Sequence, residues 1–135
     1  MAERFEDLRA WQTARELTNR VYAVPKRGLF SDDWALRDQI RRASISVMSN
    51  IADGFERRTK ARFVDVLGRA KASAGEIRCQ LLVAIDQEYL TTEEFDHASD
   101  LADKVSRQLH NLIQYLAESA GAGQVRELPA EYVAR

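Results

Sequence analysis

A glutamate–histidine step is the part of the sequence that most resembles a metal site. Glu94 and His97 stand three residues apart in Glu94-Phe95-Asp96-His97, the spacing with which some four-helix bundles bind iron. Such a site requires a second copy of the step and two further carboxylates that face inward. The sequence has one copy, at the exposed start of a predicted helix. We therefore expect no bound metal and no other cofactor.

The other side chains that could perform catalysis lack partners in the sequence. His110 lies among Leu109, Asn111 and Leu112, and the single cysteine, Cys79, has no histidine near it. A general base or a thiolate nucleophile works only in a suitable constellation. The sequence also contains no glycine-rich phosphate loop and no cysteine pairs with zinc spacing. These observations predict a protein that is not an enzyme.

The remaining chemistry is the binding of phosphate by arginine and lysine. The formal net charge is −1, yet residues 37–78 hold ten basic and five acidic residues, whereas residues 79–135 hold four basic and ten acidic ones. A hairpin of the second and third predicted helices would gather the basic residues at one end, where they could contact RNA or DNA. The candidate contacts are the loop residues Arg57, Arg58, Lys60 and Arg62, and the helix residues Arg37, Arg41, Arg69 and Lys71. The competing interpretation is that these charges only keep helix surfaces solvated.

Length and composition predict one all-α domain. The chain has 135 residues with two prolines and six glycines, and good helix formers fill the intervals. Apolar residues recur every three or four positions in four stretches, which predicts helices over about residues 8–24, 34–54, 63–85 and 92–120. Short connections predict an antiparallel up-and-down four-helix bundle over residues 1–120, with a tail over residues 121–135. Whether the tail docks on its own subunit or on a neighbour stays open.

Two residues are expected to end the second helix, and three aromatic residues could stack on bases. Asn50 and Gly54 are predicted at the helix end, with Gly54 at a positive φ that other residues resist. Trp11 and Trp34 follow apolar stripes, so we expect them in the core or at an interface. Phe55 stands beside the basic loop, and its role stays open between packing and stacking.

Counting along a hairpin centred on Arg57 gives an expected register. It places Ser46 near Gly68, and Glu76 near three charged residues of the second helix, Asp38, Arg41 and Arg42. We therefore expect Glu76 to pair with an arginine. Arg41 and Arg42 are expected to bond to Glu76, to Asp38 or to a neighbouring subunit rather than to a ligand.

The sequence also predicts a cytoplasmic location and no membrane association. No apolar run approaches the roughly 18 to 20 residues that a membrane-spanning helix needs. The segment Met1 to Asp7 lacks the apolar stretch of a secretory signal, and Cys79 has no partner for an intramolecular disulfide.

Three segments carry a resemblance to a known family. They are Phe5-x-Asp7-Leu8-x-x-Trp11, then Gln39-Ile40-Arg41-Arg42-Ala43 with Asn50-Ile51-Ala52-x-Gly54, then Phe63-x-x-x-Leu67-x-x-Ala70-x-x-Ser73-x-x-Glu76. In this order, the chain from about Phe5 to Leu116 resembles the four-helix-bundle proteins encoded within intervening sequences of bacterial large-subunit rRNA genes. It departs from the family pattern at Asp53, where Glu is usual, and at Ala72, where Gly is common.

The resemblance implies a ring-shaped homopentamer and a structural role for the motif residues Arg42, Asn50, Gly54, Ser73 and Glu76. The fold is also similar to that of the accessory proteins of diversity-generating retroelements, which are implicated in binding nucleic acid and a reverse transcriptase. Our hypothesis is a non-enzymatic, self-assembling bundle that offers a basic surface to RNA or DNA, with such a protein partner as a further candidate ligand. The alternative is a protein-only scaffold or adaptor whose charges serve solubility.

Overall fold

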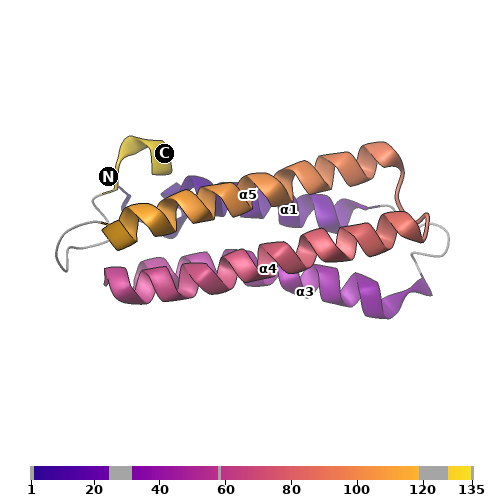
Figure 1. Cartoon of the computed structure of the whole chain (residues 1–135), viewed down its shortest axis with the longest axis horizontal. Helices are drawn as coiled ribbons and strands as arrows, with labels where there is room; N and C mark the ends of the chain where they lie inside the picture. The colour runs from indigo at the N-terminus through magenta and orange to yellow at the C-terminus, as the bar shows by residue number, and fades with distance from the viewer. Residues whose placement is uncertain (1, 25–31, 58, 119–127, 135) are drawn as a thin grey trace.

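The computed structural model describes residues 2–24, 32–57, 59–118 and 128–134, and these residues form an all-α structure (Figure 1). Its four long helices are α1 (Arg9–Ala23), α3 (Trp34–Glu56), α4 (Lys60–Asp86) and α5 (Thr92–Glu118). Short 3-10 helices, η1 (Phe5–Asp7) and η2 (Ala130–Tyr132), stand at the two ends of the chain. Within the described residues, α1 packs against α3 and α5, and α4 packs against the same two helices. The prediction of an all-α four-helix structure is confirmed.

Short polar side chains fix where the helices begin. The Asp33 carboxylate accepts a hydrogen bond from the Leu36 amide at 3.1 Å and caps α3. Thr91 and Glu94 form a reciprocal capping box, in which the Glu94 amide donates to Thr91 Oγ1 at 3.1 Å and the Thr91 amide donates to Glu94 Oε1 at 2.9 Å. The cap of α5 is therefore Thr91, one residue before the predicted start of the helix.

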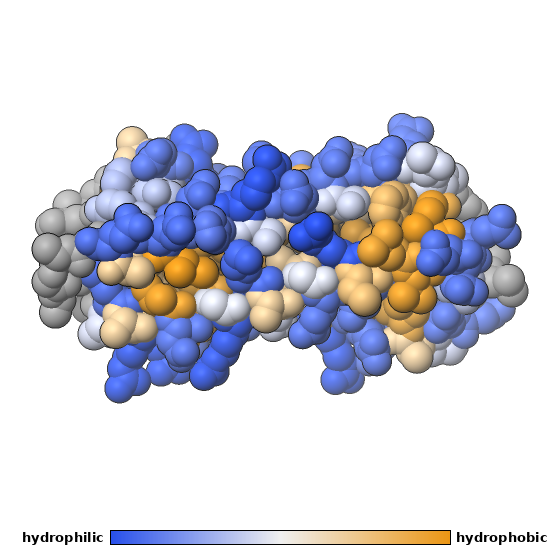
Figure 2. Space-filling model, viewed as in Figure 1, coloured by the Kyte–Doolittle hydropathy of each residue, from blue (hydrophilic) through white to orange (hydrophobic). Residues whose placement is uncertain are grey.

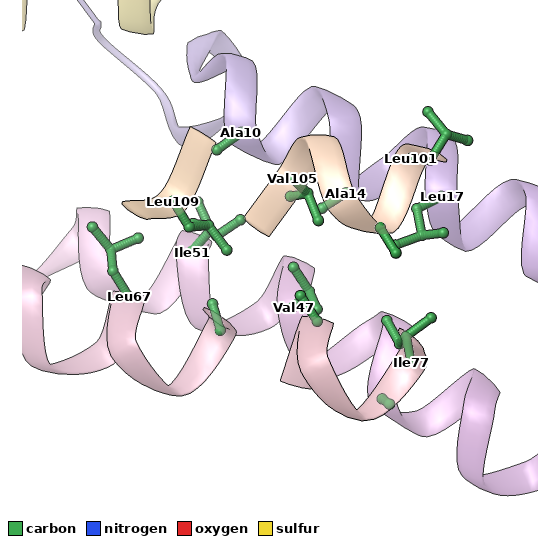
Figure 3. Packing of buried hydrophobic residues seen from close by; sticks show 14 of the residues in the cluster. Ala10, Ala14, Leu17, Val47, Ile51, Leu67, Ile77, Leu101, Val105 and Leu109 are labelled. Atoms are coloured by element: carbon green, nitrogen blue, oxygen red, sulfur yellow. The ribbon is translucent and has the colours of Figure 1, made fainter. Parts of the chain in front are cut away.

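The apolar stripes of the four helices meet in one core (Figure 3). Leu17 of α1, Val47 and Ile51 of α3, Leu67 and Ile77 of α4, and Val105 and Leu109 of α5 are all fully buried. Burial of a side chain of this size stabilises the fold by about 1.5–3 kcal/mol. The three- and four-residue spacing seen in the sequence thus corresponds to the inward faces of the helices.

Gly54 lies within α3, and the prediction that it ends the helix at a positive φ is wrong. Helix α3 continues to Glu56, and Arg57 follows as its C-cap in the right-handed α region. A Cβ at residue 54 would come 2.7 Å from Cδ1 of Phe63, which is fully buried in the first turn of α4. Glycine is required here because α4 crosses α3 too closely for a side chain.

Asn50 also lies within α3 rather than at its end, where it belongs to a polar contact between α3 and α4. Its amide donates to the Ser46 carbonyl at 2.9 Å and to Ser46 Oγ at 3.0 Å. Ser46 Oγ in turn lies 3.0 Å from Ser73 Oγ of α4. Ser46 and the motif residues Asn50 and Ser73 thereby form hydrogen bonds with one another at the contact between two helices.

The Ser46–Ser73 contact corrects the expected register, which had placed Ser46 beside Gly68. The α4 partner lies five positions further along the chain. Glu76 is exposed and forms no ion pair within the described part of the chain, so its expected pairing with an arginine is wrong. Arg42 instead pairs with Asp38 at 2.8 Å, one of the alternatives that the sequence allowed.

Residues 128–134 of the tail dock on their own chain. Val133 forms an antiparallel bridge with Leu8, the Ala134 amide donates to the Asp7 carbonyl at 2.8 Å, and the Gln12 side-chain amide donates to the Ala134 carbonyl at 2.6 Å. Leu128 and Val133 are buried. Figure 1 shows this segment beside the N-terminal segment and the C-terminal part of α5.

No helix among the described residues combines the length and the apolar character needed to cross a membrane. Arg58 and the predicted boundary between bundle and tail at residues 120–121 lie outside the described residues.

Candidate nucleic-acid interface

Among the described residues, the basic side chains predicted to bind nucleic acid lie on three different sides of the structure, so the expectation that a hairpin gathers them at one end is wrong. Arg37 and Arg41 lie in the first part of α3, whereas Arg57 follows its last residue. At 1.5 Å of rise per residue, Arg37 and Arg57 are about 30 Å apart along the helix axis. Helix α4 divides its own basic residues between two sides.

Arg37 and Arg41 are held against aromatic rings near the start of α3. The guanidinium carbon of Arg37 lies 5.0 Å from the centroid of the Trp34 ring, and that of Arg41 lies 4.5 Å from the centroid of Tyr22 in α1. Cation–π contacts of this kind contribute about 0.5–1 kcal/mol at exposed sites. Trp34 is 73% exposed, so it is not a core residue.

Arg57 and Arg69 are paired with aspartates one turn earlier in their own helices. Arg57 lies 3.1 Å from Asp53 and Arg69 lies 3.4 Å from Asp65, and all four side chains are substantially exposed. Exposed pairs of this kind add little stability. They do, however, place a carboxylate beside each guanidinium and so weaken the local positive potential.

The basic residues of α4 form two stripes on opposite sides of the helix. Lys71 and Arg78 are seven residues apart, as are Arg62 and Arg69. At 3.6 residues per turn, the two pairs point about 180° away from each other. Lys71 and Arg78, with Lys60 at the same angle, lie on the side of α4 that faces α5. Arg62 and Arg69 lie on the side that faces α3.

The stripe on the α5 side borders a groove. Lys71 and Arg78 line it from α4, and Asp103, Arg107, His110 and Asn111 line it from α5, around a volume of about 320 Å³. Arg107 pairs with Asp103 at 3.3 Å. The groove therefore presents three permanent cations and one carboxylate, together with an imidazole and an amide that can donate hydrogen bonds.

Figure 2 shows the face that contains this groove as strongly hydrophilic near its middle, between two apolar patches nearer the ends. The predicted set included Lys71 of the groove but not Arg78, Arg107 or His110. The seven-residue step from Lys71 to Arg78 is a signal that could have identified one shared helix face. Nothing in the sequence could have placed Arg107 opposite them, because that depends on how α5 packs against α4.

Phe55 is fully buried and makes an edge-on contact with Phe63, with ring centroids 6.2 Å apart. A ring in this position cannot stack on a base, which resolves the alternative that the sequence left open. Trp11 is half-buried against Phe5, with the ring centroids 5.2 Å apart.

A hydrophobic groove lies on the other side of α4. It has a volume of about 430 Å³ and is lined by Leu36 and Gln39 of α3 and by Glu76, Cys79 and Val83 of α4, among others. Several apolar side chains of the structure are exposed, among them Ile45 of α3 and Leu82 and Val83 of α4. Apolar exposure of this kind is typical of protein interaction surfaces.

Both residues of the glutamate–histidine step make structural contacts at the start of α5. Glu94 belongs to the capping box with Thr91, and Nε2 of His97 lies 3.5 Å from a guanidinium nitrogen of Arg20. Over residues 2–24, 32–57, 59–118 and 128–134, no three His, Cys, Asp or Glu side chains gather in a way that could hold a metal ion. Cys79 is exposed.

At the same end of the bundle, the Tyr89 hydroxyl donates a hydrogen bond to the Asp33 carboxylate at 3.0 Å. This bond raises the pKa of the tyrosine above its usual value. This bond joins the end of α4 to the cap of α3. It lies far from the basic groove, and it contributes to structure rather than to binding.

Comparison with known proteins gives a family and a fold. The model of the 23S rRNA-intervening sequence protein family matches residues 6–111. No curated protein matches the chain. A solved structure of a protein of unknown function from the S23 ribosomal protein family of Bacteroides thetaiotaomicron is similar, with a TM-score of 0.72 and 22% sequence identity over 78% of this chain and 98% of that one. At this identity the structural likeness concerns the fold, whereas the sequence match covers most of the chain. The chain belongs to the 23S rRNA-intervening sequence protein family.

Proposed function

We propose that this protein is a non-enzymatic, self-assembling helical bundle that binds nucleic acid through the groove between α4 and α5. The observation that carries the proposal is the meeting of Lys71 and Arg78 with Arg107 from the neighbouring helix around one hollow. Arginine binds phosphate in a bidentate manner, and lysine binds it as a point charge. His110 and Asn111 add hydrogen-bond donors of the type that position a nucleic-acid backbone.

The overall charge limits how such binding works. With a formal net charge of −1, the chain lacks the long-range attraction of a strongly basic domain. Binding therefore depends on a few local contacts. For three cations on a single strand, the logarithm of affinity should fall with the logarithm of salt with a slope of about −2.

Self-assembly would multiply this weak site. The resemblance to intervening-sequence proteins implies a ring of five copies, and the exposed apolar residues Ile45, Leu82 and Val83 supply surface for contacts between copies. Several grooves in one particle would engage one strand together, so the apparent affinity would exceed that of a single groove.

The absence of catalysis is part of the proposal. His110 stands beside cations rather than beside a nucleophile, and Glu94 and His97 have structural contacts at the start of α5. These positions support binding rather than bond-breaking chemistry.

The test compares two double variants of the same helix. Lys71→Glu with Arg78→Glu reverses two charges in the groove, and Arg62→Glu with Arg69→Glu reverses two charges on the opposite side of α4. Light scattering gives the particle mass of each protein, and fluorescence anisotropy with a labelled single-stranded RNA gives its affinity at low and high salt. Loss of binding in the groove variant alone, with an unchanged particle mass, supports the proposal. Equal binding by both variants contradicts it.

A protein-only scaffold is the second candidate, and the hydrophobic groove between α3 and α4 favours it. Leu36 and Val83 line that groove and could contact an apolar side chain of a partner protein. By the likeness to retroelement accessory proteins, that partner would be a reverse transcriptase. An assembled particle that ignores RNA even at low salt would select this candidate.

A further inference from the structure

A third hollow, the tail cavity, lies where the tail docks on the bundle. It is a half-open hollow with a volume of about 400 Å³, lined by residues of α1, α5 and η2, among them Arg9, Gln108, Asn111, Tyr115, Glu118 and Tyr132. Sites for small organic groups start at about 300 Å³. This cavity is therefore large enough for one ring system.

The cavity depends on residues outside the family match. The match ends at residue 111, whereas Tyr115, Glu118, Glu131 and Tyr132 follow it. The part of the tail that closes the cavity is fixed to the N-terminal segment by the Leu8–Val133 bridge and by the hydrogen bonds of Asp7 and Gln12. The site is thus built by this chain's own C-terminal region.

We infer that the tail cavity holds one unstacked base of a nucleic-acid strand whose phosphates lie in the α4–α5 groove. This inference rests on the proposed function and narrows it to single strands. A base in a duplex is stacked and paired, whereas single strands can turn a base outward into an aromatic pocket.

The two sites adjoin across α5. Asn111 lines both the groove and the cavity. From that residue, Arg107 and His110 face the groove, and Gln108 and Tyr115 face the cavity. A strand that follows the groove therefore reaches the cavity by crossing the exposed surface at Asn111.

The cavity has side chains that suit a base. The rings of Tyr115 and Tyr132 lie with their centroids 5.4 Å apart at 39°, which gives an aromatic wall. Base-on-aromatic stacking is a common contribution to single-strand binding. Gln108 adds an acceptor, because its Oε1 is buried without a hydrogen-bond partner within the described residues and can meet a donor after rotation of the amide.

The charges of the cavity exclude phosphate and select among bases. Burial and the nearby carboxylates of Glu131 and Glu118 raise the pKa of Tyr132, so the region around its hydroxyl is negative. A phosphate would be repelled there. Carboxylates accept hydrogen bonds from the amino groups of adenine, cytosine and guanine, whereas uracil offers one N3–H donor between two carbonyl oxygens that they repel. Arg9, the first residue of α1, also lines the cavity and can contact the phosphate that adjoins the bound base.

The experiment measures anisotropy of labelled strands of about 12 nucleotides, within the range of site sizes for single-strand binders. The strands are oligo-A, oligo-C, oligo-U and an abasic strand of equal length. The native protein should bind oligo-A and oligo-C about tenfold more tightly than the abasic strand, with oligo-U between them. Tyr132→Ala should remove this difference and leave the salt slope unchanged.

A second variant keeps the aromatic wall and the docked tail. Glu118→Gln with Glu131→Gln should raise affinity for the abasic strand slightly at low salt, because two negative charges are removed. Relative to that strand, the variant should lose the preference for oligo-A and oligo-C over oligo-U. Melting temperatures of all variants report whether the tail stays docked.

The outcomes distinguish the proposed function of the groove from the proposed base pocket in the tail cavity. If Lys71→Glu with Arg78→Glu abolishes binding while native protein binds all strands equally, the groove is a nucleic-acid site and the base pocket is wrong. If no strand binds at low salt, the proposed function itself fails. If double-stranded RNA binds as tightly as single strands of the same length, the single-strand inference is overturned.

Discussion

The two sides of α4 carry the same kind of residue at the same spacing and differ in their surroundings. On the α3 side, Arg62 and Arg69 follow a seven-residue step, and Arg69 is paired with Asp65 of its own helix. On the α5 side, Lys71 and Arg78 follow the same step, but a third cation, Arg107, faces them across a hollow. A single helix presents its charges on a convex surface. A neighbouring helix packed beside it forms a groove, so that charged side chains can line both walls.

Charge reversal should show the largest difference between the two sides. Lys71→Glu with Arg78→Glu is expected to lower RNA affinity at low salt by about 100-fold, because two phosphate contacts are lost and two repulsions are added. Arg62→Glu with Arg69→Glu is expected to change it by less than about threefold. Anisotropy titrations measure both, and a larger loss in the second variant would move the site to the α3 side.

The close approach of α3 and α4 should be the next most sensitive feature. Gly54→Ala is expected to lower the free energy of unfolding by about 1–3 kcal/mol, because the new Cβ would overlap the buried Phe63 ring. Gly68→Ala is the matched control, since a Cβ at residue 68 meets nothing within 4 Å. It should raise stability by about 0.5–1 kcal/mol through helix propensity. Urea unfolding followed by circular dichroism distinguishes these results, and equal effects would refute the packing role of Gly54.

The polar contact on the α3 side is expected to have a smaller effect. Ser73→Ala removes the partner of Ser46 Oγ and should cost about 1 kcal/mol or less, since the Asn50 amide continues to donate to that oxygen. The same denaturation experiment measures the change. A Ser46→Ala, Ser73→Ala double variant whose loss of stability equals the sum of the two single losses would mean that the two serines do not act as a pair.

The smallest expected effect on RNA affinity concerns Asp103, the carboxylate that lines the groove. Asp103→Asn removes the one carboxylate of the groove and frees Arg107 from its 3.3 Å ion pair. RNA affinity should rise by about two- to fivefold at low salt, and the gain should vanish at high salt. Asp65→Asn, which frees Arg69 on the other side of α4, is the control and should leave affinity unchanged. A fall in affinity for Asp103→Asn would mean that Asp103 is needed to orient Arg107.

Much of the fold could be predicted from the sequence because helix signals are local. The apolar spacing gave the inward faces of four helices, and the predicted start of the second helix near residue 34 agrees with the start of α3 at Trp34. Predictions failed where a residue's role depends on a second helix. Gly54 looked like a helix end, yet Phe63 of α4 requires it to be glycine, and Ser46 meets Ser73 rather than Gly68.

For the candidate site, only Lys71 belonged to both the predicted set and the groove. The enrichment of basic residues in the middle of the sequence was real, but helix geometry spreads them over three flanks. The groove also contains Arg107, which belongs to the acidic part of the chain. The excess of acidic residues there did not indicate a nucleic-acid contact.

By itself, the sequence determined which segments are helical, which face of each helix turns inward and which family the chain resembles, because periodicity, capping and motif spacing are properties of neighbouring residues. Only the tertiary structure decided the register between α3 and α4 and the docking of residues 128–134 on the N-terminal segment. It also decided that Arg107 lies in the same groove as Lys71 and Arg78. Those features arise where side chains from distant parts of the chain pack together, and steric fit between whole helices sets them.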